Sequence, residues 1–247
     1  MSTYMEITER NALWAAPVIV LVIAATVSLP LLKTWARGAS GTLGLVGQPY
    51  IREELLYQLL TLGVTGLVLL ATYLARPTGF DRFFGFGQID APVTPVKAIG
   101  INPGPNETWQ HVGLNFAVVI TAVTAVFIYL QAFRGNSIAQ QNLRYLPWVL
   151  IFALSNAFVE EMITRFAVVA ALWNIVPLWA IYLVSAAIFG LVHYFGTPGG
   201  IPGVLMAGFL GRFAAKSIGE TGGFFWAWVI HFLQDVVIFA GFFFVNL

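Results

Sequence analysis

Seven long apolar runs are the feature that most constrains this chain. They cover residues 11–32, 55–75, 112–133, 146–173, 177–194, 202–215 and 224–247, and charged or turn-forming residues separate them. A helix needs about 20 apolar residues to cross the ~30 Å hydrocarbon layer of a membrane. We therefore predict an all-α fold, a polytopic integral membrane helix bundle of about seven to eight transmembrane helices, forming a single domain over residues 1–247.

The charge content excludes several classes of protein. The 247 residues include 12 Lys and Arg and 11 Asp and Glu, which is 9% of the chain, whereas a soluble domain carries about 25% charged residues. A soluble enzyme, a disordered tail and a nucleic-acid binder are thus excluded, so no nucleic-acid partner is expected. The absence of Cys excludes disulfides, thiolate nucleophiles and cysteine-ligated metals.

Six acidic, basic or His residues lie inside three of the apolar runs, 146–173, 177–194 and 224–247, where charge is unfavourable. They are Glu160, Glu161, Arg165, His193, His231 and Asp235. A charge at the centre of a membrane helix costs about 2.5 to 3.5 kcal/mol, so the four charged members together cost roughly 10 kcal/mol, which is comparable to the stability of a whole domain. We expect these residues to compensate one another or to line a polar intramembrane cavity, and so to be functional.

Helical spacing sorts these residues into pairs. Glu161 and Arg165 are four apart and share a helix face, while Glu160 points about 100° away and is left free. His231 and Asp235 are also four apart, so Asp235 is expected to accept a proton from His231 and to fix its tautomer.

Each of these features also has a purely structural interpretation. A Glu–Arg pair near a helix end is often an interfacial ion pair, and a lone intramembrane His is often a hydrogen-bonded helix contact. Together, however, a free Glu, two His and an Asp on three helices are the parts of a water-activating site.

The motifs also resemble those of a known family. Glu160-Glu161-x-x-x-Arg165, Phe189-x-x-x-His193 and His231-x-x-x-Asp235, in this order, resemble the signature of the CAAX prenyl protease and bacteriocin-processing family of intramembrane peptidases. The glycine-rich segment 208–227 is similar to the one that precedes the last motif in that family. The resemblance covers about residues 146–235.

This resemblance implies an intramembrane endopeptidase. Its substrate would be a membrane-associated peptide or protein, cut in CAAX-type, leader or anchor processing, and its location would be the bilayer of a prokaryotic cell as an integral, multi-pass protein. Glu161 and Arg165 would hold the geometry of the site.

The resemblance further implies four catalytic residues. Glu160 and His193 would activate a water molecule for attack on a peptide carbonyl, and His231 with Asp235 would stabilise the oxyanion. Elementary chemistry agrees for the first pair, because a desolvated carboxylate beside a His can be tuned to act as a general base near neutral pH.

Asp235 raises a difficulty, since an ionised carboxylate donates no hydrogen bond and repels an oxyanion. Three explanations are open: Asp235 is protonated, it only orients His231, or it binds a metal. Glu160, His193, His231 and Asp235 form an acceptable ligand set for zinc. We favour the metal-independent glutamate mechanism, with no cofactor.

Two other functions fit parts of the pattern. A catalytically inactive immunity or scaffolding protein of the same fold would be expected to have lost motif residues, and a proton-relaying transporter would need polar residues along several helices to both membrane faces. Arg212 and Lys216, four apart outside the motifs, are expected to extend to the membrane interface.

Overall fold

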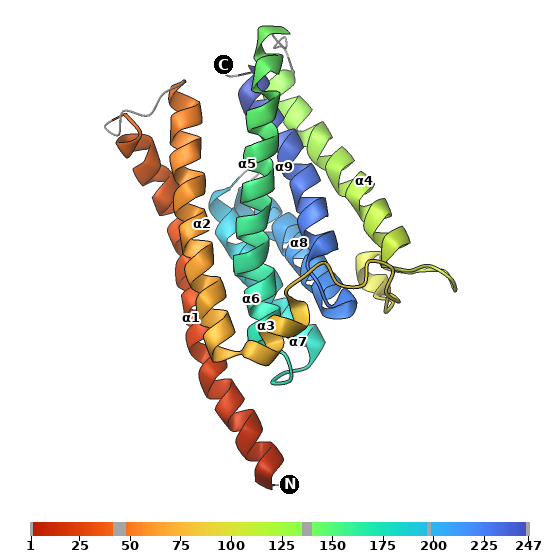
Figure 1. Ribbon diagram of the computed structural model, residues 1–247. Coiled ribbons are helices and arrows are strands. Elements are labelled where there is room, and N and C mark those ends of the chain that lie inside the picture. Colours follow the sequence, from red (N-terminus) through yellow and green to blue (C-terminus); the bar gives the residue numbers. More distant parts are fainter. Residues whose placement is uncertain (1, 42–47, 135–139, 197–198, 246–247) are drawn as a thin grey trace.

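A computed structural model describes residues 2–41, 48–134, 140–196 and 199–245, and their regular structure is helical (Figure 1). The α-helices are α1 (Ser2–Ala39), α2 (Pro49–Ala75), α3 (Pro77–Phe83), α4 (Trp109–Ile128), α5 (Leu146–Glu161), α6 (Ala167–Leu172), α7 (Leu178–Val192), α8 (Gly200–Thr221) and α9 (Phe225–Val245). Shorter 3₁₀ or π turns are η1 (Lys97–Ile99), η2 (Tyr129–Phe133), η3 (Gln140–Tyr145), η4 (Met162–Phe166) and η5 (His193–Phe195).

Seven helical segments of the described chain are long and apolar enough to cross a membrane, which confirms the predicted fold class. They are Ala12–Ala39, Pro49–Ala75, Trp109–Gln131, Asn142–Leu172, Leu178–Phe195, Gly200–Thr221 and Phe225–Phe244. The protein is therefore an integral, multi-pass membrane protein.

Two spans are longer than the sequence predicts, because the charged residue that follows each apolar run is paired with a Glu and the helix continues past it. The first helix continues past Lys33, whose ammonium pairs with Glu54 of α2. The sixth span continues past Lys216, which is buried and pairs with Glu220, so the expectation that Lys216 extends to an interface is wrong. Glu220 also accepts a hydrogen bond from the Trp109 indole at 2.9 Å, which ties α8 to the start of α4.

The bundle places α5 at its centre (Figure 1). This helix packs against α2 on one side and α9 on the other, while α1 pairs with α2 and α4 pairs with α9. Its continuation α6 belongs to the main apolar core, where every residue from Ala167 to Ala171 is buried. Residues projecting from the C-terminal half of α5 thus face several helices at once.

Small residues set the distance between α7 and α8. A side chain at Gly190 would place its Cβ 2.8 Å from the Val204 carbonyl oxygen and 3.1 Å from the Cα of Gly208, and one at Gly211 would lie 3.2 Å from the Cα of Ala186. Gly190 and Gly211 thus allow α7 and α8 to approach each other closely. His193 follows α7 directly, so this crossing fixes the position of its backbone.

The segment between the second and third spans packs onto α6. Arg76, which is buried, donates hydrogen bonds to the carbonyl oxygens of Ala171 at 3.1 Å and Trp173 at 2.8 Å, and so satisfies carbonyl groups at the C-terminal end of α6. Phe80 and Phe84 of this segment contact the ring of Phe166.

We predict that Gly190→Ala destabilises the protein by about 1 to 3 kcal/mol, because the added methyl group forces α7 and α8 apart. Thermal unfolding of the purified protein in detergent measures this. Gly66→Ala on α2 is the matched control, since its Cβ would meet nothing within 4 Å. Equal effects of the two substitutions would contradict the close packing of α7 against α8.

Candidate active site

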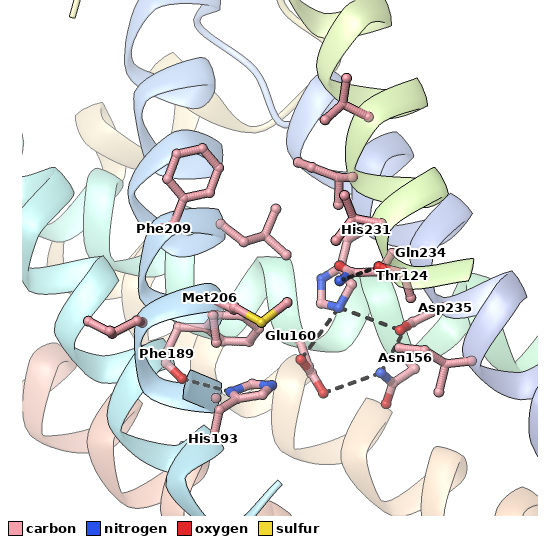
Figure 2. A pocket seen from close by; sticks show the side chains of 18 of the residues that line it. Thr124, Asn156, Glu160, Phe189, His193, Met206, Phe209, His231, Gln234 and Asp235 are labelled. Atoms are coloured by element: carbon pink, nitrogen blue, oxygen red, sulfur yellow. Dashed lines mark hydrogen bonds and ion pairs between the residues drawn. The ribbon is translucent and has the colours of Figure 1, made fainter. Parts of the chain in front are cut away.

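Four residues predicted from the sequence line one cavity of about 570 Å³ (Figure 2). Glu160 comes from α5, His193 from the turn that ends α7, and His231 and Asp235 from α9. The remaining wall is mainly apolar and includes Val119, Ile120 and Val123 of α4, Leu205, Met206, Phe209 and Leu210 of α8, and Ile238 and Phe239 of α9. The cavity is thus apolar with a polar end.

A π-helical turn interrupts the helix next to the acidic pair. This turn, Met162–Phe166, follows Glu161 and contains Arg165. Such π turns are rare and frequently occur at functional sites, where they change which residues share a helix face. Here Arg165 still reaches Glu161, as the sequence predicted.

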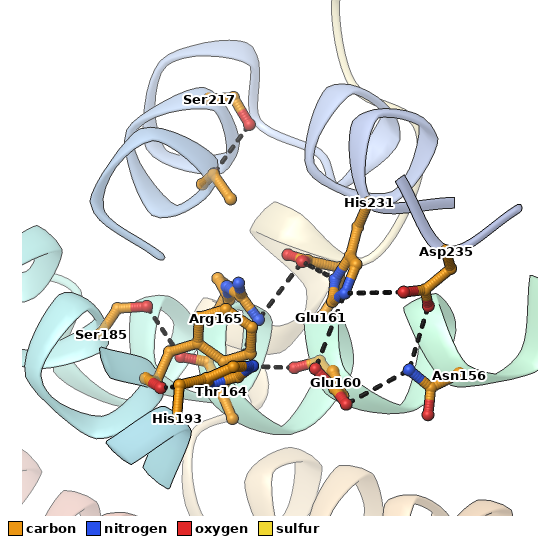
Figure 3. Close-up of polar contacts among 12 residues, drawn as sticks. Asn156, Glu160, Glu161, Thr164, Arg165, Ser185, His193, Ser217, His231 and Asp235 are labelled. Atoms are coloured by element: carbon orange, nitrogen blue, oxygen red, sulfur yellow. Dashed lines mark hydrogen bonds and ion pairs between the residues drawn. The ribbon is translucent and has the colours of Figure 1, made fainter. Parts of the chain in front are cut away.

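Arg165 and Glu161 form a fully buried ion pair (Figure 3). The Arg165 Nη1 atom lies 3.3 Å from Glu161 Oε1, and both side chains have no solvent exposure. Nη1 also donates to Thr164 Oγ1 at 2.7 Å, and the guanidinium carbon lies 3.4 Å from the centre of the Phe189 ring, which suits a cation–π contact. Among the described residues, Arg165 Nε and Nη2 have no hydrogen-bond partner.

His231 is held by Glu161 rather than by Asp235. Its Nδ1 atom lies 2.7 Å from Glu161 Oε1, whereas Nε2 lies 3.6 Å from Asp235 Oδ1, which is too long for a hydrogen bond. The expectation that Asp235 fixes the His231 tautomer is thus not met by the structure. Helical spacing does place the two on one face of α9, but Nδ1 of the ring points toward α5, where Glu161 lies.

Glu160 and His193 face the cavity (Figure 2). The Glu160 side chain is 18% exposed and is therefore accessible from the cavity, unlike Glu161. His193 Nδ1 lies 2.7 Å from the Phe189 carbonyl oxygen. Because a carbonyl oxygen can only accept a hydrogen bond, Nδ1 carries a proton, and in the neutral ring Nε2 is an acceptor.

Asn156 is a member of the site that the sequence interpretation missed. Its Nδ2 atom donates to Glu160 Oε1 at 3.2 Å and to Asp235 Oδ2 at 3.0 Å (Figure 3). The sequence held a signal for it, since Asn156 lies four residues before Glu160 and so on the same helix face.

A second cavity, of about 400 Å³, meets the first at the polar end. Both are lined by Asn156, Glu160 and His193, while Lys33 and Tyr57, from α1 and α2, line only the second. Glu160 and His193 are thus accessible from two sides, one apolar and one with charged groups.

The four candidate metal ligands do not converge on one point. Within the described residues, no group of three or more His, Asp or Glu side chains is placed to hold a metal ion. The Asn156 amide lies between two of the carboxylates and binds both. In these positions the side chains do not form a tetrahedral zinc site.

We predict that Arg165→Met lowers the free energy of unfolding by about 3 to 5 kcal/mol, because it leaves the Glu161 carboxylate buried without its cation. Denaturant or thermal unfolding in detergent measures the loss. Arg212→Met is the matched control, since Arg212 is only partly buried and forms no ion pair with any residue in the described part of the chain, and it should cost less than about 1 kcal/mol. Similar losses for both variants would show that the buried pair does not stabilise the bundle.

Comparison with known proteins agrees with the motifs. Residues 142–237 match the family model described as type II CAAX prenyl endopeptidase Rce1-like. A search of curated proteins and a search of solved structures returned no match. The matched segment contains all the motif residues, and α1 to α4 lie outside it. The match over this segment is consistent with the CAAX prenyl protease and bacteriocin-processing family of intramembrane peptidases, which the motifs resemble.

Proposed function

We propose that the protein is an intramembrane endopeptidase in which Glu160 and His193 activate a water molecule. The observation that carries this proposal is that both residues line the same apolar cavity of about 570 Å³ within a membrane-spanning bundle. The match to a CAAX-type endopeptidase family supports the reaction class.

The apolar lining of the cavity favours a substrate with a long apolar group. Side chains of α4, α8 and α9 supply its apolar wall, and the polar end lies at Glu160. An isoprenoid attached near the cleavage point would bury its chain against Val123, Met206 and Phe209, at a gain of about 25 cal/mol for each Å² of apolar surface. The scissile carbonyl would then lie beside Glu160 and His193. We therefore propose a prenylated, CAAX-type peptide or protein as the substrate.

The hydrolytic step uses both residues at one water molecule. His193 Nε2 accepts one hydrogen bond from the water, and the Glu160 carboxylate removes a proton as the water oxygen attacks the carbonyl carbon. The tetrahedral intermediate then loses its amine as the C–N bond breaks, and the proton returns from Glu160 to the amine nitrogen. Water is consumed, and a new carboxyl group and a new amine are formed.

His231 is the group best placed to stabilise the oxyanion. Glu161 accepts a hydrogen bond from the Nδ1–H group, so Nε2 is directed toward the cavity, close to Glu160 and Asp235. When protonated, Nε2 donates a hydrogen bond to the developing negative charge. Glu161 binds the Nδ1 side of the His231 ring and is itself paired with Arg165, and these contacts keep the ring in this orientation.

We predict that Glu160→Gln abolishes cleavage, with a loss of at least about 1000-fold in kcat, because an amide cannot accept the proton of water. The assay uses purified protein in liposomes, a farnesylated CAAX-type peptide, and mass spectrometry of the fragments. Gln keeps the shape of Glu and can still accept a hydrogen bond from Asn156, so the fold is retained.

Glu107→Gln is the control for this experiment, since Glu107 lies in an exposed loop away from the cavity. It should keep full activity. Cleavage by Glu160→Gln at the wild-type rate would contradict the glutamate mechanism. A wild-type protein that cleaves neither prenylated nor unmodified peptides would instead favour the inactive scaffold.

We predict that removal of metal ions leaves activity unchanged, because the proposed steps need only protein side chains and water. Protein dialysed against a chelator, and shown by elemental analysis to contain no zinc, should cleave the same peptide at the untreated rate. Loss of activity that added zinc restores would contradict the metal-independent mechanism and would support the alternative ligand set of Glu160, His193, His231 and Asp235.

A further inference from the structure

We propose that Asn156 is a positioning residue for catalysis, whose amide nitrogen bridges the carboxylates of Glu160 and Asp235 and holds both in their working orientation. The inference rests on the proposed function and assigns a role to a residue outside the three motifs.

The amide nitrogen is the donor that the two carboxylates share. Asn156 Nδ2 lies 3.2 Å from Glu160 Oε1 and 3.0 Å from Asp235 Oδ2, so its two hydrogens serve two acceptors. On the other side, His231 Nε2 lies 3.6 Å from both Glu160 Oε2 and Asp235 Oδ1. The two carboxylates are therefore enclosed between one amide and one imidazole (Figure 3).

The carboxylates of Glu160 and Asp235, which contact the same amide nitrogen, need a shared hydrogen-bond donor. Like charges repel strongly in an environment of low dielectric constant. Among the described residues, neither Glu160 nor Asp235 has a Lys or Arg within ion-pair distance, because Arg165 pairs with Glu161. Hydrogen bonds from a neutral amide to both carboxylates offset part of this repulsion without adding charge.

The bridge also limits the rotation of Glu160. One oxygen, Oε1, is engaged by Asn156, which leaves Oε2 on the side of His231 and the cavity. A general base must hold its oxygen within hydrogen-bond reach of the attacking water, and a misplacement of about 1 Å can reduce the rate by about 100-fold. Asn156 thus acts through Glu160, not on the substrate.

This arrangement addresses the difficulty that Asp235 raises. An ionised Asp at this position cannot donate a hydrogen bond to the oxyanion. In this chain the amide lies across the site, on α5, four residues before Glu160. Asp235 then accepts from Asn156, and His231 remains the donor to the oxyanion.

The test first removes the Asn156 amide and then exchanges it with the Asp235 carboxylate. Asn156→Asp is isosteric, but it removes the donor and places a third carboxylate at the polar end of the cavity. We expect kcat for the farnesylated peptide to fall about 10- to 100-fold with little change in KM, and the unfolding temperature to fall as well. The double variant Asn156→Asp/Asp235→Asn again has one amide facing one acid, so it should recover part of the loss in unfolding temperature. It still lacks the donor to Glu160 Oε1, so kcat should stay low.

Ser155→Ala is the matched control. Ser155 is the neighbouring polar residue, but its hydroxyl donates to Gln58 Oε1 at 2.7 Å and not to the site residues. It should leave kcat and KM unchanged.

The two readouts separate the failure of this inference from failure of the proposed function. An active wild type together with a fully active Asn156→Asp variant, or a double variant that recovers full kcat without the donor to Glu160, would overturn the role of Asn156 alone. A wild type without cleavage would overturn the proposed function and with it the catalytic role of Asn156. The unfolding temperatures of the single and double variants would then still show whether positions 156 and 235 interact.

Discussion

The buried chain of contacts from Arg165 through Glu161 to His231 is the interaction on which the rest of the site depends. A charged side chain with no solvent exposure inside a membrane bundle is tolerated only when a partner compensates it. Glu161 Oε1 forms an ion pair with Arg165 and lies 2.7 Å from His231 Nδ1, so one carboxylate holds a cation on its own helical segment and a ring on α9. This contact links the central helix to the last one and orients the group proposed to face the oxyanion.

Glu160 is available for chemistry because its neighbour takes the cation. The two adjacent carboxylates have different environments: Glu161 is fully buried in the bundle, while Glu160 lines two cavities. An apolar cavity on one side and a cavity bearing Lys33 and Tyr57 on the other would suit a substrate with a lipid group and a polar peptide. The first two helices, which lie outside the matched family segment, supply those polar groups.

Much of the fold and part of the site could be predicted from the sequence, for local reasons. Apolar length predicts a membrane span, and a spacing of four residues predicts a contact such as Glu161 with Arg165. The partner of His231 could not be predicted in this way, because it depends on how α9 is rotated against α5. Lys216 was misjudged although Glu220 lies four residues later on the same helix, because the contact of Glu220 with Trp109, which holds this pair inside the bundle, depends on the packing of α8 against α4. Asn156 could have been found by extending the same four-residue rule backwards from Glu160.

The central claim is that water, activated at Glu160, attacks the peptide directly. Cleavage of a farnesylated peptide by the protein in liposomes prepared in H₂¹⁸O, with rapid quenching and mass spectrometry of both peptide and protein, tests it most directly. We predict one ¹⁸O atom in the new carboxyl group and an unchanged protein mass at every time point. A covalent adduct of peptide and protein, or a product without the label, would contradict the claim.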